Sequence, residues 1–296
     1  MPLKIGVLMG GPGEEREVSI ATGNAVVKAC IENGFHVVEF SFRKNYKKYL
    51  NPMIKQDIIF NALHGGLGEN GIIQFWFDEN GIKYTGSGHL SSALCMDKAK
   101  SKDIAKRNGV LTPKWQLILN KEEEIEIELP FVVKPNDQGS TVGLSIVQND
   151  IEIKSAIKKA FQYGDQVIIE KFISGKELTI PIVGSTVLPV VEIKPSNEFY
   201  DYECKYTPGM SEYVCPAELE SSIVNLIESN TSILFEAFGC SVYARADYIL
   251  DNSGQVYFLE MNTLPGMTST SLVPKSANAS GIAFAELISD IIKLSL

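Results

Sequence analysis

Three oxygen-bearing side chains, Asp247, Glu260 and Asn262, stand in apolar segments of the C-terminal part of the chain. In the stretch YFLEMNTLPGM, Glu260 and Asn262 are two residues apart, so a β-strand would place both on one face, where burial is costly unless a partner offsets it. Antiparallel pairing with the preceding strand would bring Asp247 beside them. Two carboxylates and one amide suit Mg2+, which keeps its other positions for water and substrate phosphates. The simpler alternative, an ion pair between Glu260 and Arg245, explains fewer of these residues.

A phosphate-bearing ligand would also need cations and a flexible backbone cradle. Lys134 ends the apolar strand PFVVK, and the following PNDQGSTVG holds Gly139, Ser140 and Gly143, whose backbone N–H groups could fold over phosphate oxygens. The chain has no Walker A spacing, and a glycine-containing hairpin tip is by itself an ordinary turn. The adjacent strand lysine is what favours a phosphate site here.

Several further candidates each have an ordinary alternative. Lys98 lies on a helix with Lys100 and Lys102, a pattern typical of a solvated face. Glu170 and Lys171 follow the apolar strand QVII, which fits either an exposed strand end or an edge that faces an adenine ring. Composition alone leaves that choice open.

His64 and Glu15 are candidates from the N-terminal part of the chain. His64 ends a strand at a glycine turn in NALHGGLGEN, which fits a locally hydrogen-bonded histidine as well as a functional one. Glu15 stands near a helix start, where carboxylates usually cap the helix or offset its dipole. The surrounding GGPGEEREVS lacks the glycine order of a dinucleotide-binding loop.

The elements that must position these residues begin with a small parallel α/β lobe, predicted from the first ninety residues. A strand over 4–9 leads through a glycine turn into a helix over 18–31. Two further strands are predicted in HVVEFSF and DIIFNAL, and GIIQFWFDENG predicts a helix that Gly81 ends.

The next part of the chain predicts a second lobe. A helix over 96–108 is followed by the solvated connector NKEEEIEIELP, two strands in FVVKPNDQGSTVGLSIV, a helix in DIEIKSAIKKAFQYG and the strand QVIIEKFI.

From residue 176 onward the pattern predicts a hairpin, a long loop over 194–216, a helix over 218–238, two strands around an Asn-Ser-Gly turn and a helix over 282–294. A loop of that length in a compact domain is either functional or disordered. Its tyrosines and lysines favour function, and we expect a lid over 197–214.

Composition excludes several classes of protein. The 296 residues are 45% hydrophobic and 21% charged, enough for a large core divided among two or three lobes. A net charge of -9 argues against nucleic acid as a partner. The five cysteines form neither a CxxC pair nor a short disulfide framework, which favours a reducing cytoplasm. No apolar run is long enough to span a membrane, and the first residues lack a signal-peptide pattern.

Taken together, the motifs resemble those of the D-alanine–D-alanine ligases, a family of the ATP-grasp superfamily. They stand in the family's order, which is GGPGEEREVS, NALHGGLGENG, YTGSG, MDKAKSK, VVKPNDQGSTVG, IEKFISGKELT, FYDYECKY and LEMNTLPGMTSTSLVP. The likeness runs from about Lys4 to the final helix, and FYDYECKY and PGMTSTSLVP are specific to this group.

The resemblance implies an α/β, ATP-grasp fold of three lobes. These are an N-terminal parallel α/β substrate lobe over 1–96, a central α+β lobe over 97–175 and a C-terminal α+β catalytic lobe over 176–296. The implied activity is ATP-dependent joining of two D-alanines through an acyl phosphate, for peptidoglycan precursor synthesis. A cytoplasmic homodimer without nucleic-acid or membrane partners is implied as well.

The same resemblance assigns the nucleotide and metal contacts. Lys98 and Lys134 would hold the α and β phosphates under the Ser140 loop, and Lys205 would face the transferred phosphoryl group. The adenine and ribose contacts would be Glu170, Lys171, Phe172, Ile173 and Glu177. The ligands of two Mg2+ or Mn2+ ions would be Asp247, Glu260 and Asn262.

For the two D-alanines, the resemblance places Glu15 at the first ammonium and His64 near the first substrate. Ser271 and the Leu272 N–H would take the second carboxylate. Arg245 and the Gly266 N–H would form the oxyanion site. Glu15, Ser140 and Tyr206 would form a hydrogen-bonded set that closes the loop.

Two departures and three rival functions accompany this resemblance. HGGLGENG stands where the family more usually has HGRGGEDG, which leaves the local loop contacts open, and Phe172 stands where tryptophan is common but keeps an apolar adenine wall. The rivals are another carboxylate–amine ligase, a depsipeptide ligase that accepts D-lactate and a nucleotide-binding module without turnover. Tyr206 argues against the depsipeptide ligase, and the complete set of metal ligands, phosphate lysines and Arg245 argues against the inactive module.

Overall fold

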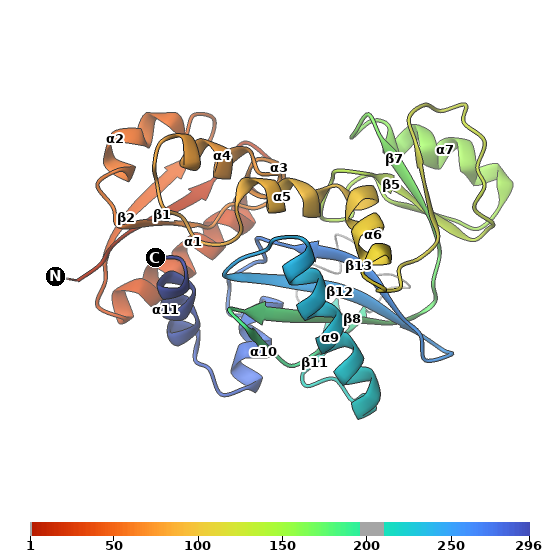
Figure 1. Ribbon diagram of the computed structural model, residues 1–296. Helices are drawn as coiled ribbons and strands as arrows, with labels where there is room; N and C mark the ends of the chain where they lie inside the picture. The colour runs from red at the N-terminus through yellow and green to blue at the C-terminus, as the bar shows by residue number, and fades with distance from the viewer. Residues whose placement is uncertain (1, 196–209) are drawn as a thin grey trace.

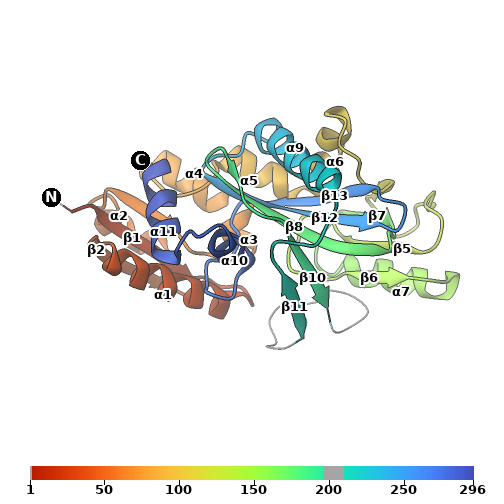
Figure 2. The same ribbon diagram turned by 90° about the horizontal axis from the view of Figure 1, so that it is seen from below.

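The computed structural model describes residues 2–195 and 210–296, and these form three β-sheets with helices packed around them (Figure 1). The three sheets follow one another along the chain. A view from below shows the N-terminal sheet at one end of the molecule, the C-terminal sheet in the middle and the central sheet at the other end (Figure 2).

The N-terminal lobe is built on a parallel sheet in the order β2-β1-β3. Its strands are β1 (Lys4–Gly10), β2 (His36–Phe42) and β3 (Ile58–Asn61). Its helices are α1 (Arg16–Glu32), η1 (Lys47–Tyr49), α2 (Leu50–Met53), α3 (Gly66–Glu69), α4 (Ile72–Glu79) and α5 (His89–Met96). The central strand β1 is buried from its second residue onward, as its unbroken apolar run requires. The predicted parallel α/β lobe is confirmed.

The central lobe is an antiparallel sheet in the order β4-β7-β5-β6, covered by one helix. Its elements are β4 (Trp115–Ile118), β5 (Phe131–Pro135), β6 (Ser145–Val147), α7 (Asp150–Ala160) and β7 (Val167–Lys171). Ala156, Ile157 and Ala160 of α7 pack into the same core as Phe131 and Val133 of β5.

The C-terminal lobe is an antiparallel sheet in the order β11-β10-β8-β12-β13, with β9 paired to β8. Its strands are β8 (Gly175–Val183), β9 (Thr186–Val187), β10 (Val191–Pro195), β11 (Ser211–Val214), β12 (Tyr243–Asp251) and β13 (Val256–Asn262). The helix α9 (Ser221–Ala237) packs against this sheet.

One helix connects the central and C-terminal lobes. The helix α6 (Lys98–Arg107) starts at Asp97, whose side chain accepts a hydrogen bond from the Lys100 N–H at 3.1 Å. The Ala99 N–H donates to the Asn136 side chain of the central lobe, while Ala105 packs into the core of the C-terminal lobe. The helix α6 therefore fastens the central sheet to the C-terminal sheet.

The chain returns to its first lobe through α10 (Leu272–Ala279) and α11 (Phe284–Leu294). The helix α11 packs against α1, and both figures place it beside the N-terminal sheet (Figures 1 and 2). Its buried residues Leu287, Ile288, Ile291 and Ile292 belong to the N-terminal core.

Most predicted elements are confirmed, with three differences. The prediction of a loop over 194–216 is wrong at both ends, because 194–195 end β10 and 211–214 form β11, which pairs with it. The short elements η1, α2, α3, α5, β4 and α10 were not predicted. The predicted lid over 197–214 lies mostly outside the described residues.

The cysteines of the described residues are free thiols, and Cys95 Sγ lies 3.8 Å from Cys240 Sγ. Within the described residues, no helix has the length and apolar character needed to cross a membrane.

Candidate active site

A cleft of about 1700 Å³ opens where the three lobes meet. It is lined by all the predicted site residues that the structure describes, which are Glu15, His64, Lys98, Lys134, Ser140, Glu170, Lys171, Phe172, Ile173, Glu177, Arg245, Asp247, Glu260, Asn262, Gly266, Ser271 and Leu272. The two remaining predicted residues, Lys205 and Tyr206, lie outside the described residues. Sequence positions up to 257 residues apart are thus brought to one cavity.

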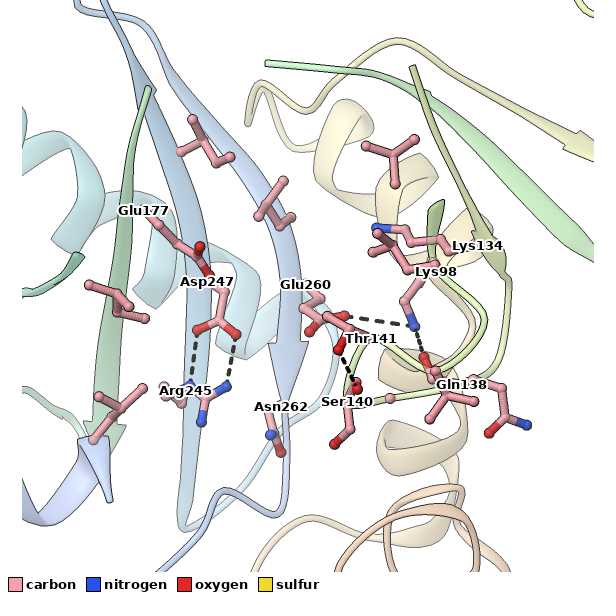
Figure 3. Close-up of a pocket in the computed structure, with 18 of the residues that line it drawn as sticks. Lys98, Lys134, Gln138, Ser140, Thr141, Glu177, Arg245, Asp247, Glu260 and Asn262 are labelled. Carbon is pink, nitrogen blue, oxygen red and sulfur yellow. Dashed lines mark hydrogen bonds and ion pairs between the residues drawn. The ribbon is translucent and has the colours of Figure 1, made fainter. Parts of the chain in front are cut away.

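The β12–β13 hairpin places the three oxygen donors at the cleft (Figure 3). Asp247 is opposite Glu260 in the antiparallel register, and Arg245 is opposite Asn262. The register shifts after Asp247, which marks a local irregularity of the kind that re-aims side chains next to active sites. The predicted convergence of Asp247 and Glu260 therefore follows directly from strand pairing.

Arg245 forms a bidentate ion pair with Asp247 and not, within the described residues, with Glu260. Its Nε and Nη2 lie 2.9 and 2.8 Å from the two carboxylate oxygens, and Thr179 Oγ1 donates to Asp247 Oδ1 at 2.5 Å. Glu260 Oε2 instead faces Lys98 Nζ across the cleft at 3.7 Å (Figure 3). The alternative of an Arg245–Glu260 pair is therefore wrong for the described residues.

The donor set fits a divalent cation only in combination with a ligand. No group of three His, Cys, Asp or Glu side chains in the described part of the chain could hold a metal ion by itself. Two carboxylates and the Asn262 amide leave coordination positions for phosphate oxygens and water, which is how Mg2+ is usually held.

A buried lysine, Lys98, and a partly buried one, Lys134, face these donors from the central side of the cleft. Lys98 is only 4% exposed, and its Nζ donates to the Gln138 carbonyl at 2.5 Å. Burial lowers the pKa of Lys98, while the nearby Glu260 opposes that shift. Lys134 Nζ lies 3.1 Å from Glu170 Oε2. The expected solvated face is wrong for Lys98, because this face of α6 packs into the lobe junction.

The loop between β5 and β6 reaches across to the N-terminal lobe. Ser140 and Thr141 have φ values of 51° and 60°, an unusual backbone for residues other than glycine and typical of functional loops. Ser140 Oγ donates a short hydrogen bond to the Glu15 carboxylate. The Glu15 side chain makes no capping hydrogen bond to α1, so of its two ordinary explanations only the offset of the helix dipole remains.

Glycine at position 65 is required beside Glu15. Gly65 has φ +67°, and a Cβ on it would meet Glu15 Oε2 at 2.1 Å. The glycine turn after β3 therefore makes room for the carboxylate.

Glu69 is a functional candidate that the sequence reasoning missed. Its Oε1 accepts a hydrogen bond from the Gly65 N–H at 2.8 Å and lies 3.9 Å from His64 Nδ1. Burial raises the pKa of Glu69 to about 7, and the nearby Glu15 adds to the shift. The sequence signal for this residue is the glutamate that HGGLGENG keeps four residues after Gly65.

His64 is buried and neutral at physiological pH. Burial lowers its pKa to about 4, with a further contribution from Arg245. Its Nε2 lies 3.0 Å from Thr22 Oγ1. His64 thus bonds to a residue of α1 that is distant in sequence rather than to a local partner, and it lines the cleft, where a functional role stays a prediction.

The far end of the cleft is formed by β7 and the segment after it. Glu170 is 3% exposed, while Phe172, Ile173 and Glu177 are partly exposed. The Lys171 side chain donates to the Leu129 carbonyl at 2.9 Å. Lys171 is thus anchored to the connector before β5.

At the opposite end, Ser271 precedes α10, with Leu272 as the first helical residue. Ser271 Oγ accepts from the Thr268 N–H at 3.0 Å, and a Cβ at Gly266 would lie 3.0 Å from the same oxygen. A helix start is a favourable place for a carboxylate, because its N–H groups lack partners in the helix.

Comparisons with known proteins agree with this geometry. A family model described as D-ala D-ala ligase C-terminus matches residues 103–293. The D-alanine–D-alanine ligase of Methylacidiphilum infernorum is 42% identical over 295 residues, covering 100% of this chain and 96% of the relative. That of Syntrophotalea carbinolica is 40% identical over 291 residues, covering 98% of this chain and 95% of the relative.

Solved structures give the same result. The D-alanine–D-alanine ligase of Bacillus anthracis complexed with ATP matches with a TM-score of 0.88 at 35% identity, covering 99% of this chain and 97% of that one. The VanG D-Ala:D-Ser ligase of Enterococcus faecalis also has a TM-score of 0.88, at 30% identity and full coverage of both chains. The ATP-grasp fold implied by the motifs is confirmed, and the chain belongs to the D-alanine–D-alanine ligase family.

Proposed function

We propose that this protein uses ATP to join two D-alanines into D-alanyl-D-alanine for peptidoglycan precursor synthesis. The observation that carries the proposal is that Lys98 and Glu260 face each other at 3.7 Å across a cleft between the two sheets. A bound metal–triphosphate needs a cation for its phosphates, which Lys98 supplies from the central side, and a carboxylate for its metal, which Glu260 supplies from the hairpin side. Family membership supplies the substrate class.

The phosphates of ATP would lie between Lys98, Lys134 and the backbone of the Ser140 loop. The two lysines enter from different elements, α6 and β5, so they can contact different phosphate groups. Lys205, outside the described residues, is the family's candidate for the transferred group. Glu170, Lys171, Phe172 and Ile173 would contact the adenine, and Glu177 the ribose.

Asp247, Glu260 and Asn262 would hold Mg2+ or Mn2+, and such ions neutralise phosphate charge during transfer. Without a ligand, Asp247 is balanced by Arg245 and Glu260 faces Lys98. These existing contacts would loosen when metal and triphosphate enter.

The first D-alanine would bind with its ammonium at Glu15 and its carboxylate toward the phosphates, beside His64. The carboxylate takes the γ-phosphoryl group as ADP forms, and the amine of the second D-alanine then attacks the acyl carbon and displaces phosphate. Arg245 and the Gly266 N–H would stabilise the negative oxygen that develops in this step. Ser271 and the Leu272 N–H would bind the second carboxylate.

A phosphate-release assay with ATP tests the proposal across D-alanine, L-alanine, D-serine and D-lactate, with the products identified by mass spectrometry. D-Alanine should give the largest rate and yield D-alanyl-D-alanine. A chain that hydrolyses ATP without forming dipeptide, or that prefers L-alanine, would contradict it.

We infer lobe boundaries at 1–96, 97–175 and 176–296. In support, the three sheets span 4–61, 115–171 and 175–262, almost wholly within these ranges. The helix α11, although in the last range, packs on the first lobe. We also infer a cytoplasmic location, supported by the widely spaced cysteines and by the substrate class.

A homodimer is the proposed assembly, formed through the exposed apolar side chains of α4 and α5. Ile72, Phe75 and Leu90 are 53%, 51% and 75% exposed, and the Phe75 ring lies 5.4 Å from that of His89. Such exposed patches often mark protein contacts. Sedimentation analysis should give twice the chain mass for the native protein and the monomer mass for Leu90→Glu; a native monomer would rule out the assembly.

A further inference from the structure

Lys102 is a fully buried lysine for which the proposed function has no use. It lies in the middle of α6 and is 0% exposed, whereas the Lys100 side chain on the same helix is 73% exposed. The sequence pattern predicts a solvated face for both, and for Lys102 this is wrong. A buried ammonium costs several kcal/mol unless it is well paired, so its partners should explain why it is there.

The partners of Lys102 come from both sheets of the cleft. Its Nζ lies 3.2 Å from Glu170 Oε1 on β7, 3.3 Å from the Leu259 carbonyl on β13 and 3.0 Å from Thr112 Oγ1. Thr112 in turn donates to the Phe258 carbonyl at 2.9 Å. The lysine thus ties Glu170 to the strand that carries Glu260.

Glu170 is held by two lysines from opposite sides. Its Oε2 lies 3.1 Å from Lys134 Nζ, and its Oε1 lies 3.2 Å from Lys102 Nζ. Lys102 occupies at most one of the two acceptor positions of Oε1, so this buried oxygen can still accept a further hydrogen bond. A buried carboxylate oxygen with unused acceptor capacity in the wall of a ligand cleft indicates a donor on the ligand.

The two lysines also fix the charge of this carboxylate. Burial raises the pKa of Glu170, but Lys102 and Lys134 together outweigh burial and hold it below its ordinary value. An ionised carboxylate can only accept hydrogen bonds, whereas a protonated carboxyl or an amide can also donate. A 6-amino purine presents a donor at the ring position where a 6-oxo purine presents an acceptor.

We propose that Lys102 is a positioning residue for base selection, which holds Glu170 as an acceptor-only group and so favours a 6-amino over a 6-oxo purine nucleotide. The inference rests on the proposed adenine contact of Glu170. Removing the charge of Lys102 leaves Glu170 buried beside one lysine instead of two. Glu170 then takes up a proton more readily and can also donate to a 6-oxo group.

The test is isothermal titration calorimetry with ATP and with inosine triphosphate (ITP), each with Mg2+, on the native chain and on Lys102→Met. The ratio of the two dissociation constants should favour ATP in the native chain, and Lys102→Met should reduce that ratio by roughly tenfold or more, the worth of a charge-assisted hydrogen bond. Lys102→Arg keeps the charge and should restore most of the preference. Lys100→Met, the exposed control on the same helix, should leave the ratio unchanged.

Glu170→Gln separates the possible outcomes. It should lose the ATP preference as Lys102→Met does, and the double variant should lose little more, because both changes act through one carboxylate. Equal weakening of ATP and ITP in Lys102→Met, with the ratio unchanged, would reduce Lys102 to a packing role and overturn the proposal. An unchanged ratio in Glu170→Gln would overturn it too, by removing the adenine contact. Where Lys102→Met does not fold, Lys102→Gln, which keeps two N–H donors without charge, takes its place.

Binding needs neither D-alanine nor turnover, so this test is separate from that of the ligase activity. A chain that selects ATP through Lys102 but makes no dipeptide contradicts the proposed function alone. A chain that makes dipeptide but shows no effect of Lys102 on base selection contradicts this inference alone.

Discussion

Glu260 brings a carboxylate to the cleft opposite Lys98. Its distance of 3.7 Å from Lys98 is too long for a hydrogen bond, and a partly exposed pair of this kind adds little stability. The carboxylate side chain is 33% exposed at the cleft surface. Loss of this carboxylate should therefore lower the turnover rate more than the stability of the protein.

Glu260→Gln keeps the shape of the side chain and removes its charge. Turnover should fall at least about a hundredfold, because a metal–phosphate contact is lost during phosphoryl transfer. The melting temperature should change little. Phosphate release and thermal unfolding measure the two effects, with Glu236→Gln on the exposed face of α9 as the control. Normal Mg2+-dependent turnover in Glu260→Gln would remove this residue from the metal site.

Glu69 affects stability, because the folded protein disfavours the ionised form of its carboxyl group. Its pKa rises from 4.5 to about 7, chiefly through burial and then through Glu15. Below pH 4.5 the carboxyl is protonated in both folded and unfolded chains and costs nothing. Between pH 4.5 and about 7 the unfolded chain is ionised while the folded chain still holds the proton, so stability falls across this range and levels off above it.

Glu69→Gln should therefore stabilise the ligand-free protein at pH 8 by up to about 3 kcal/mol, the equivalent of the pKa shift. The gain should shrink to less than about 1 kcal/mol at pH 5, where most of the shift is not yet expressed, since the glutamine still accepts the Gly65 N–H bond. Thermal unfolding at both pH values tests this, and Glu79→Gln, exposed on α4, should show no such pH dependence. Equal stability of Glu69→Gln and the native chain at pH 8 would show that ionisation of Glu69 does not destabilise the folded protein.

At the scale of elements, local pattern predicted most of the sheets and long helices but not the short pieces between them. The hairpin of β12 and β13 followed from apolar alternation and an Asn-Ser-Gly turn, and it carried Asp247 and Glu260 with it. In contrast, α10 has Pro274 in its first turn, which is tolerated there but makes the segment look like a loop. The strand β11 forms by pairing with β10, and its own sequence carries no strand pattern that predicts it.

Burial of single charges was the least predictable property. Lys98 and Lys102 lie on a helix whose sequence is strongly polar, so its periodicity predicts exposure. They are buried because α6 is sandwiched between two sheets, which is a property of tertiary packing. The raised pKa of Glu69 is unpredictable for the same reason, because its neighbours Glu15 and Glu260 come from other elements.

The turn after β3 offers a test of how one element positions another. Gly65→Ala places a methyl group 2.1 Å from Glu15 Oε2, so the carboxylate must move from its place beside Ser140. The KM for D-alanine should rise about tenfold, the cost of weakening one charge-assisted hydrogen bond. Steady-state kinetics with varied D-alanine measures it.

Gly109→Ala is the matched control for this change. Gly109 has φ +76°, close to the +67° of Gly65, and nothing lies within 4 Å of its Cβ position. Both variants should lose about 1–2 kcal/mol of stability from the left-handed backbone. Only Gly65→Ala should alter KM; an equal effect of both on KM would mean that backbone strain, and not Glu15, is responsible.

For the molecule as a whole, the cleft depends on the chain closing back on its first lobe. Glu15 and His64 reach the cleft from the N-terminal lobe, while the residues proposed to hold metal and phosphates come from the other two. The helix α11 covers α1 with side chains that complete the N-terminal core. The last helix of the chain thus stabilises the lobe that would hold the first substrate.

Ile288→Ala tests this dependence. Ile288 is 0% exposed, so its truncation should cost about 2–5 kcal/mol of stability, from lost burial and the cavity left behind. Because α11 contacts α1, hydrogen exchange should accelerate in α1 and β1, while α7, which packs in a separate core, keeps its protection. Leu294→Ala, at a position 51% exposed on the same helix, should change neither. Uniform acceleration across all three lobes in Ile288→Ala would instead mean that the protein unfolds as one unit, and the N-terminal lobe would have no separate stability for α11 to control.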